Sequence, residues 1–338
     1  MSSPDMDSTA VDDAAARAFA TEFGEASRAF PPVAIVIAAF NEADVVGQVI
    51  EALPAEVCGL ETAVLVVSDG SKDKTVGTAK THGALVCDVP VNRGQGAALR
   101  LGYRLAREGG ATYIVTTDAD GQYNPAEMEQ VLAPVVAGQA DFVTGSRKLG
   151  SQETKDPVRR LGTWVFAKAI SVLTHQHITD SSFGLRAMRA EVTGAVRLEQ
   201  PQYQSSELLI AVLAHGYRVA EVPATIHKRQ VGESKKGHNA IYGLKFAGVV
   251  AGTWWRERQR RVPGSGSADV SAAGRRPGDR SAAPFPAQAG DPPRTAPDAP
   301  AANGSRPESL SAGTGVPEAS TAETTESASP DPRSAKRT

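Results

Sequence analysis

The chain has 338 residues, of which 41% are hydrophobic and 22% are charged, and its formal net charge at pH 7 is −2. Its length suits one large domain or two small ones, and its apolar content is enough for a real core. A charge so close to neutral excludes a protein that binds nucleic acid through an overall basic surface, so any basic surface must be local.

Several features predict a cytoplasmic protein. The two cysteines, Cys58 and Cys87, lie far apart in apolar surroundings, which is not the pattern of a disulfide scaffold and fits a reducing compartment. The first residues lack the charged-then-apolar pattern of a secretion signal. No uninterrupted apolar run reaches the roughly 20 residues that a membrane-spanning helix needs.

Four segments follow one another along the chain. Residues 1–30 are polar and Ala-rich and are expected to be flexible or partly helical, with 12–27 as the helical candidate. Residues 31–237 are expected to form the main domain, and 238–261 an amphipathic helix. Residues 262–338 are rich in Pro, Gly, Ala, Ser and Thr, and such a composition predicts a disordered tail.

Within the main domain, strand-like apolar runs alternate with helix-like segments. Strands are expected at residues 33–38, 63–67, 85–89, 113–117 and 142–144, and helices at 43–53, 73–82, 96–108 and 125–137. This alternation predicts an α/β fold with an open, mostly parallel sheet and helices on both faces. Sheets of this kind bind ligands at the carboxyl ends of their strands.

Polar residues do follow the first two predicted strands. Ala38-Ala39-Phe40-Asn41-Glu42 closes the first strand and opens a helix. Asp69, Gly70 and Ser71 follow the second strand, where Asp69 could accept hydrogen bonds from a base or a ribose. The alternative is that Asp69 and Asp73 are only turn and helix-cap residues.

The fourth predicted strand ends in Asp118-Ala119-Asp120-Gly121-Gln122. Two carboxylates at i and i+2 after a buried strand raise each other's pKa unless a cation lies between them. Mg²⁺ or Mn²⁺ would accept these oxygens and leave sites for a diphosphate, and Gln122 could add an amide oxygen. The alternative is an ordinary Asp-Gly turn with solvated acids.

Three further features of the sequence are a turn, a set of basic residues and an apolar helix face. The Asn92–Gly96 turn is predicted to be a tight turn into a helix, because it lacks the spacing of a dinucleotide-binding fingerprint. Arg147, Arg229 and Lys235 are candidates for holding phosphates, against the alternative of solvated surface charges. Trp164, Phe166 and Val172 recur at helical spacing and predict a buried helix face.

The order of motifs resembles family 2 glycosyltransferases of the GT-A fold, in particular the polyprenyl-phosphate (dolichyl-phosphate) mannosyl- and glucosyltransferase branch. The resemblance runs from about Val33 to Lys236. The motifs that carry it are AAFNE, VSDGSKDKT, NRGQGAALRLGY, TTDADGQYNP, GSRKLG, DSSFGLRAMR, ELLIAVLAHGYRVAEVPA and RQVGESK.

The resemblance implies roles for matching positions. Donor-binding residues would be Ala38, Phe40, Glu42, Val67, Asp69, Asp118, Ala119, Asp120 and Arg147. Metal ligands would be Asp118, Asp120 and Gln122, and the phosphate or acceptor site would comprise Arg186, Arg229, Ser234 and Lys235. Catalytic residues would be Asp120, Arg147 and Asp180. Ala38, Phe40 and Ser68 replace the family's usual Pro, Tyr and first Asp, which bears on the base preference more than on the activity.

The resemblance also implies a reaction. An inverting enzyme would move a hexose from a GDP-mannose-type or UDP-glucose-type donor, with Mg²⁺ or Mn²⁺, to a polyprenyl monophosphate. That phosphate has a second pKa of about 6, so it needs no strong base. A hydroxyl acceptor would need one, with Asp180 or Glu207 as candidates. Asp180 could instead cap or orient a loop, and Glu207 could anchor the helix 207–215 to Arg186. A nucleotide-sugar binding module without turnover is a further alternative.

A surface helix is expected near the end of the domain. Residues Ala240–Trp255 are largely apolar and end beside Arg256 and Arg258, which suits a peripheral helix on an anionic membrane. The expected location is then the inner face of the plasma membrane. The alternatives are a helix packed on the domain or one that joins two subunits in a homo-oligomer.

Overall fold

The computed structural model describes residues 4–152, 157–200, 204–227, 248, 250 and 252–257. These residues all belong to one compact unit of the chain. The predicted tail, most of the predicted surface helix and the phosphate candidates Arg229, Ser234 and Lys235 lie outside the described residues.

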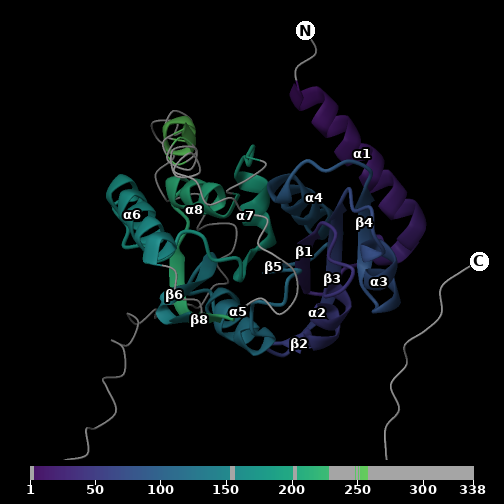
Figure 1. Ribbon diagram of the computed structural model, residues 1–338, viewed down its shortest axis with the longest axis horizontal. Helices are drawn as coiled ribbons and strands as arrows, with labels where there is room; N and C mark the ends of the chain where they lie inside the picture. The colour runs from purple at the N-terminus through teal and green to yellow at the C-terminus, as the bar shows by residue number, and fades with distance from the viewer. Residues whose placement is uncertain are drawn as a thin grey trace, which may run out of the picture. The chain divides into compact units, whose positions relative to one another are not determined.

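One eight-stranded sheet forms the centre of the described residues, with the order β2-β3-β1-β5-β7-β6-β8 and β4 paired to β3 (Figure 1). The strands are β1 (Val33–Ala39), β2 (Glu56–Val57), β3 (Leu60–Asp69), β4 (Leu85–Val89), β5 (Tyr113–Asp118), β6 (Phe142–Gln152), β7 (Arg186–Arg189) and β8 (Val219–Ile226). The helices are α1 (Pro4–Phe23), α2 (Val46–Ala52), α3 (Thr75–Thr81), α4 (Gln95–Glu108), α5 (Met128–Val136), α6 (Pro157–Thr174), α7 (Ala190–Ala195) and α8 (Gln204–Ala214), with short 3-10 turns η1 (Gly24–Ser27) and η2 (Pro125–Glu127).

The prediction of a mostly parallel sheet is confirmed for the strands β1, β3, β4 and β5. β1 pairs in parallel with both β3 and β5, and β3 pairs in parallel with β4. The apolar run Val33–Ile37 is fully buried, because helices cover both faces of these strands. The other half is mixed, since β7 runs antiparallel between β5 and β6, while β6 and β8 are parallel.

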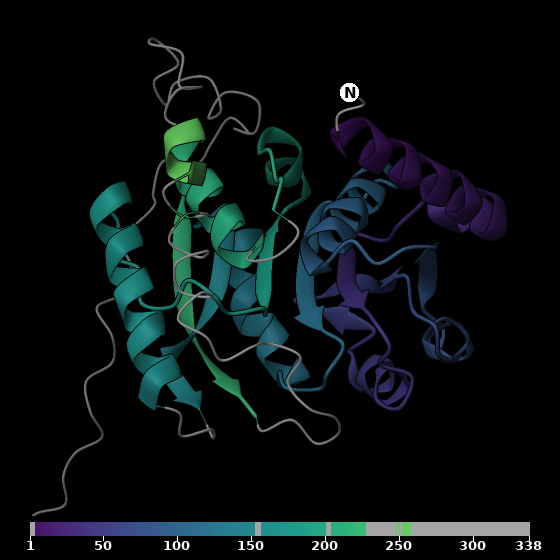
Figure 2. The ribbon, with the colours of Figure 1, turned by 45° about the horizontal axis from the view of Figure 1, so that its top comes forward.

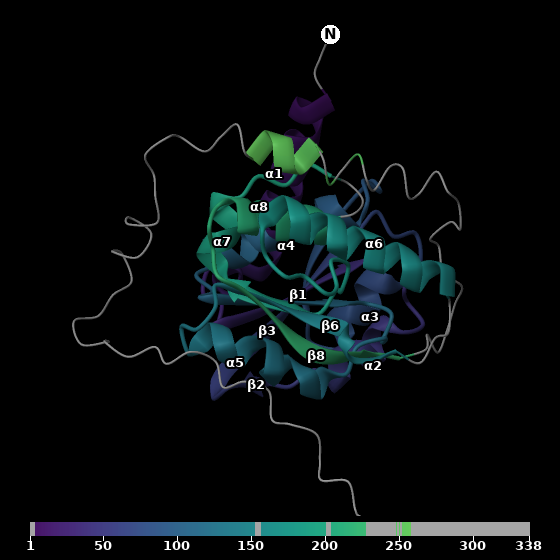
Figure 3. The same ribbon diagram turned by 90° about the vertical axis from the view of Figure 1, so that its left-hand side faces the viewer.

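Two apolar layers hold the helices to the sheet (Figure 3). Ala34 and Val36 pack in the layer shared with α1, α4, α6, α7 and α8. The alternate residues Val33, Ile35 and Ile37 pack in the layer shared with α2, α3 and α5. The alternation follows from the two-residue period of a strand, and it confirms the prediction of helices on both faces.

The N-terminal segment is more ordered than expected. α1 covers Pro4–Phe23 and η1 follows directly, so the helix begins earlier than the predicted 12–27. Ala15 and Phe19 are buried in the layer that α4 also covers, and α1 lies along β4 and α4 (Figure 2). This packing explains why the segment is helical despite its polar composition.

The prediction of a buried face on α6 is wrong in part. Trp164 is 50% exposed and Val172 is 62% exposed, whereas Phe166 packs partly against the core. The exposed face of α6 also carries Val165 and Lys168. Helical spacing identifies a common face but does not decide whether another element covers it.

The described end of the predicted surface helix packs on the domain. Trp254 Nε1 donates to Leu173 O at 3.0 Å, and Glu257 is buried. Arg256 pairs with Glu207 and Glu199. These contacts favour, for residues 252–257, the alternative of a helix packed on the domain. No helix among the described residues has the length and hydropathy needed to cross a lipid bilayer.

Candidate active site

Three predicted donor-binding residues lie in one row across the sheet. Ala38 of β1 is in register with Val67 of β3 on one side and with Asp118 of β5 on the other. Asp69 ends β3 two residues further on, and Ala119 and Asp120 directly follow β5. Parallel pairing therefore brings residues that are distant in sequence to the same carboxyl edge of the sheet.

The two acids after β5 have defined partners. Gln95 Nε2, at the start of α4, donates to Asp118 Oδ1 at 2.9 Å. Asp120 Oδ1 accepts the backbone N–H of Gln122 at 3.2 Å, while Gln122 Nε2 donates to His227 O at 2.9 Å. That bond uses the amide nitrogen of Gln122, so its Oε1 is the atom suited to ligate a cation.

The donor set at this edge fits a hard divalent cation. It offers only oxygen ligands, from two half-buried carboxylates and one amide, and this is the chemistry that Mg²⁺ and Mn²⁺ prefer. Within the described residues, no cluster of three or more His, Cys, Asp or Glu side chains could hold a metal by itself. A cation here would thus take part of its coordination from a bound diphosphate or from water.

Tyr123 and Gly184 lie close to Asp118. The backbone N–H of Gly184 donates to Tyr123 Oη at 2.9 Å. A Cβ at Gly184 would lie 2.7 Å from Tyr123 Oη and 2.9 Å from Asp118 Oδ2, so only glycine fits there without displacing one of these side chains. Burial, followed by the charge of Asp118, raises the pKa of the Tyr123 hydroxyl, which stays protonated.

The turns after β1 and β3 are bound to each other. Asn41 adopts φ 53°, and its Oδ1 accepts the backbone N–H of Lys72 at 2.8 Å. The backbone N–H of Glu42 donates to Thr75 Oγ1 at 2.9 Å, and that of Ala43 donates to Asp73 Oδ2 at 3.2 Å. These bonds fix the backbone that carries the predicted donor residues Phe40 and Glu42.

Asp69 organises the turn after β4. Its Oδ1 accepts the backbone N–H of Arg93 at 2.9 Å, and its Oδ2 accepts that of Gly94 at 2.7 Å. Gly94 has φ 95°, which confirms the predicted tight turn before α4. Asp69 is 2% exposed and both its oxygens bind this turn, which matches the alternative of a turn residue. The expected contact of Asp69 with a base or ribose stays a prediction.

Arg147 and Asp180 form a buried ion pair. Arg147 Nε donates to Asp180 Oδ2 at 2.6 Å, and Nη2 donates to Asp180 Oδ1 at 2.8 Å. Burial raises the pKa of Asp180, but the hydrogen bonds and charge of Arg147 outweigh burial and lower it overall. Asp180 is thus a poor proton acceptor, and Nη1 is the part of Arg147 that these bonds leave for a phosphate.

The structure does not support the roles predicted for Arg186 and Glu207. Arg186 is 2% exposed, donates to Phe183 O, and places its positive charge near Asp118 and Asp180. This burial argues against its direct contact with an acceptor phosphate. Glu207 is fully buried. It accepts the backbone N–H groups of Glu199 and Gln200 and pairs with Arg256, so the predicted anchor to Arg186 is wrong.

Sequence reasoning missed Gln95, Tyr123 and Gly184 as parts of the site. All three lie inside motifs that it did identify, but their roles depend on contacts with Asp118 across the fold. The signal for Gln95 was its place at the start of a helix after a strand, which is where an α/β sheet carries its ligand-binding residues.

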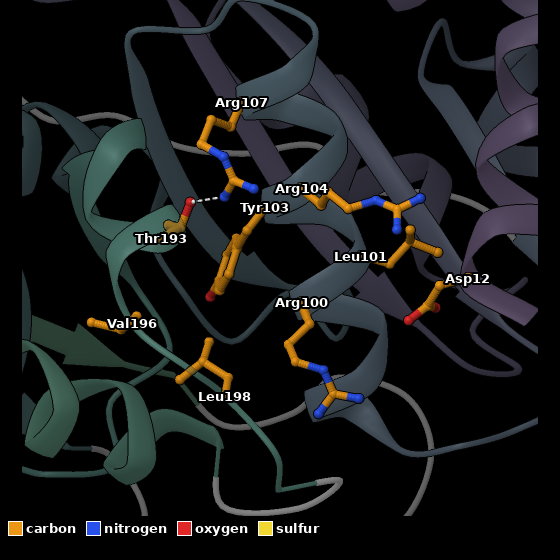
Figure 4. Close-up of a pocket in the computed structure, with 9 residues that line it drawn as sticks. All are labelled: Asp12, Arg100, Leu101, Tyr103, Arg104, Arg107, Thr193, Val196 and Leu198. Carbon is orange, nitrogen blue, oxygen red and sulfur yellow. Dashed lines mark hydrogen bonds between the residues drawn. The ribbon is translucent and has the colours of Figure 1, made fainter. Parts of the chain in front are cut away.

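A cavity of about 200 Å³ lies elsewhere, over α4 (Figure 4). Its lining residues are Asp12, Arg100, Leu101, Tyr103, Arg104, Arg107, Thr193, Val196 and Leu198. None of the predicted site residues lines it, and Arg107 donates to Thr193 Oγ1 at 3.0 Å. The chemistry of the strand ends is therefore separate from this cavity.

Known proteins share both sequence and fold with this chain. The sequence profile of glycosyl transferase family 2 matches residues 34–196. A dolichyl-phosphate hexose transferase of Haloferax volcanii is 32% identical over 61% of this chain and 87% of its own length. An undecaprenyl-phosphate mannosyltransferase of Micrococcus luteus is 30% identical over 66% of this chain and 93% of its own length.

Solved structures support the fold. Glucosyl-3-phosphoglycerate synthase from Mycobacterium tuberculosis, in complex with Mn²⁺, UDP and glucosyl-3-phosphoglycerate, matches with a TM-score of 0.52 at 22% identity. The match covers 72% of this chain and 84% of the synthase. At this identity the likeness concerns the arrangement of the chain, which is the predicted GT-A arrangement.

Proposed function

Since the chain belongs to glycosyl transferase family 2 and is a transferase enzyme, we propose that it moves a hexose from an NDP-sugar to a polyprenyl monophosphate with inversion at the anomeric carbon. Two similar relatives are named for transfer to dolichyl and undecaprenyl phosphate. Donors of the GDP-mannose and UDP-glucose type are the candidates.

The observation that carries the proposal is the position of Asp118 and Asp120. Asp118 ends β5 in the row that contains Ala38 and Val67, and Asp120 follows just after that strand end. The turn that Asp69 holds leads directly to Gln95, which donates to Asp118. A nucleotide bound over Ala38, Phe40 and Val67 would extend its diphosphate toward the two acids. Glu42 and Ala119 then border the nucleotide and the sugar, respectively.

Asp118, Asp120 and the Oε1 of Gln122 would hold a divalent cation. Such an ion, when bound, supplies positive charge that neutralises the diphosphate and stabilises it as a leaving group. Gln95 holds Asp118 by a hydrogen bond, in the way that outer residues orient metal ligands. Among solved structures of similar fold, some were obtained with Mn²⁺ or Mg²⁺ and UDP.

The state of the candidate bases favours a phosphate acceptor. Asp180 is bound to Arg147 with a lowered pKa, and Glu207 is fully buried with its oxygens occupied. Neither is placed to take a proton from a hydroxyl. A phosphate with a second pKa of about 6 is largely a dianion at neutral pH and attacks without a base.

In the proposed reaction, one bond forms and one bond breaks at the anomeric carbon of the sugar. A phosphate oxygen of the acceptor forms a bond to the anomeric carbon while the bond from that carbon to the donor diphosphate breaks. The electron pair leaves with the NDP. Arg147 Nη1 is a candidate donor to one of the phosphates, and Arg229, Ser234 and Lys235 stay proposed acceptor contacts.

The test is turnover with UDP-glucose and GDP-mannose, each with polyprenyl phosphate and Mg²⁺ or Mn²⁺. We expect one donor to yield NDP and lipid-linked sugar in equal amounts, and EDTA to lower the rate by at least about a hundredfold. NDP release that is unchanged by chelator would contradict the metal site. Binding of NDP-sugar without turnover would support the alternative of a binding module.

A lipid acceptor also requires contact with a membrane surface. The exposed face of α6 carries Trp164, Val165, Val172 and Lys168, and Lys148 Nζ lies 5.9 Å from the Trp164 ring. Apolar side chains interspersed with lysines suit the interface of an anionic bilayer. Trp255, 60% exposed, follows Trp254, which contacts the end of α6.

Flotation with vesicles that contain phosphatidylglycerol tests this surface. We expect Trp164→Ser with Val172→Ser to reduce vesicle binding by about tenfold. A tenfold change corresponds to about 1.4 kcal/mol, which two apolar side chains can contribute when they are partly buried in the bilayer interface. Val91→Ser is the matched control, since Val91 is 48% exposed on a different part of the domain. Equal binding by the double variant and the control would contradict a role for α6.

A further inference from the structure

We infer that the N-terminal helix α1 is part of the donor site, and that Asp12 is a positioning residue for nucleotide binding. The inference rests on the proposed function. It adds an element outside residues 34–196, the part of the chain that matches the family profile.

The turns after β3 and β4 lie at the carboxyl edge of the sheet, where the proposed function puts the nucleotide. Both oxygens of Asp69 bind backbone N–H groups of the turn after β4, at Arg93 and Gly94. Asn92 Nδ2 donates to Asp69 O at 3.1 Å. A Cβ at Gly70 would lie 2.4 Å from the Asn92 backbone nitrogen, so the turns after β3 and β4 are in direct backbone contact.

The turn after β4 contacts α1 through an ion pair. The guanidinium of Arg93 donates to the carboxylate of Asp12, and the two side chains are 14% and 16% exposed. Phe19, about two turns further along α1, is buried in the core. The helix is therefore anchored to the domain. Asp12 holds the side chain of Arg93, and the backbone N–H of the same Arg93 binds Asp69.

The other described ion pairs of α1 join α3 and α4, not the turn after β4. Asp13 accepts from Arg104 Nη1 of α4 at 2.7 Å, and Glu22 pairs with Lys80 of α3. Arg104 and Asp12 lie on the same side of α4 in Figure 4. Among the acids of α1 whose side chains the structure describes, Asp12 pairs with a residue of the turn after β4, whereas Asp13 and Glu22 pair with other elements.

The experiment compares Asp12→Asn with Asp13→Asn and Glu22→Gln, each of which removes one negative charge from α1. Titrations of UDP and of GDP with Mn²⁺ give the Kd, steady-state assays give KM and kcat, and thermal melts report stability. We expect Asp12→Asn to raise Kd and donor KM by about fivefold or more with little change in kcat, as for coupled sites. Asp12→Glu should restore both, and the two controls should keep wild-type Kd.

A second variant tests the same ion pair in case Asp12→Asn does not fold. Arg93→Gln removes the same pair from its other end and should raise Kd similarly, and the double variant should be no worse than either single variant. Wild-type Kd in Asp12→Asn, or an equal rise in Asp13→Asn, would overturn the inference alone. Failure of the wild-type chain to bind either nucleotide would overturn the proposed function and this inference with it.

Discussion

An Asp120→Ala enzyme is expected to lose about a thousandfold in kcat/KM for the NDP-sugar while it remains folded. Loss of a cation from the diphosphate removes several kcal/mol of charge stabilisation, and about 4 kcal/mol corresponds to three powers of ten in rate. Asp120 is half-buried after β5, where its carboxylate accepts the backbone N–H of Gln122, so its removal disturbs little of the core.

The measurement is single-turnover release of NDP, together with a Mn²⁺ titration followed by electron paramagnetic resonance. The variant should need far more Mn²⁺ for half-saturation than the wild-type enzyme. Glu129→Ala is the control, because Glu129 is an exposed acid on α5. Wild-type turnover in Asp120→Ala, with an unchanged Mn²⁺ titration, would show that the metal is held elsewhere or is absent from the reaction.

An Arg147→Leu variant is expected to be destabilised by about 3–5 kcal/mol, because the buried carboxylate of Asp180 would lose its charged partner. The Asp180 side chain is fully buried and that of Arg147 is 8% exposed. Urea denaturation at pH 7.5 measures the free energy of unfolding. Arg28→Leu is the control at an exposed position, and it should change stability by less than about 0.5 kcal/mol.

The double variant Arg147→Leu/Asp180→Leu separates stability from activity. Replacing both charges by apolar side chains is often nearly neutral for stability, so most of the lost free energy should return. Activity should stay low if Arg147 contacts a phosphate of the substrate. Recovery of both stability and activity would limit the pair to a structural role.

The pH dependence of these variants follows from the pKa of Asp180. In the wild-type protein Arg147 lowers this pKa, so the pair contributes stability above the unfolded-state pKa of about 4 and loses it as pH falls through the folded-state value. In Arg147→Leu the guanidinium is lost, and burial, which raises the pKa, is opposed only by the backbone N–H groups of Ser182 and of residue 147. We therefore expect the pKa of Asp180 to rise. The stability gap between the two proteins should therefore narrow from pH 7.5 to pH 4.5, and a gap that widens would contradict the assignment.

Local sequence patterns were enough to predict the parallel strands β1, β3, β4 and β5 and the edge where the candidate site lies. Val33–Ile37 and the runs of β3, β4 and β5 are apolar and bounded by turn residues, and strands buried on both faces require that composition. The position of Asp118 and Asp120 directly after such a strand predicted their place at the carboxyl edge.

Contacts between distant residues decided the rest. β7 has four residues, too few for a periodic signal, and only its antiparallel pairing with β5 and β6 identifies it as a strand. The partners of Arg147, Glu207 and Arg256 could not be read from spacing, since each pair joins separate elements. Trp164 likewise lies at helical spacing from Val172, yet folding leaves its side chain 50% exposed.

The sequence by itself was enough to predict the family, the parallel strands and the oxygen-bearing residues proposed as cation ligands, because these depend on residue type and local period. Only the tertiary structure decided that Asp180 is neutralised by Arg147, that Gln95 holds Asp118, and that α1 reaches the Asp69 turn through Asp12. The reason is physical. Burial and charge pairing are properties of side chains brought together by folding, and residues 81 positions apart, such as Asp12 and Arg93, carry no local sign of their contact.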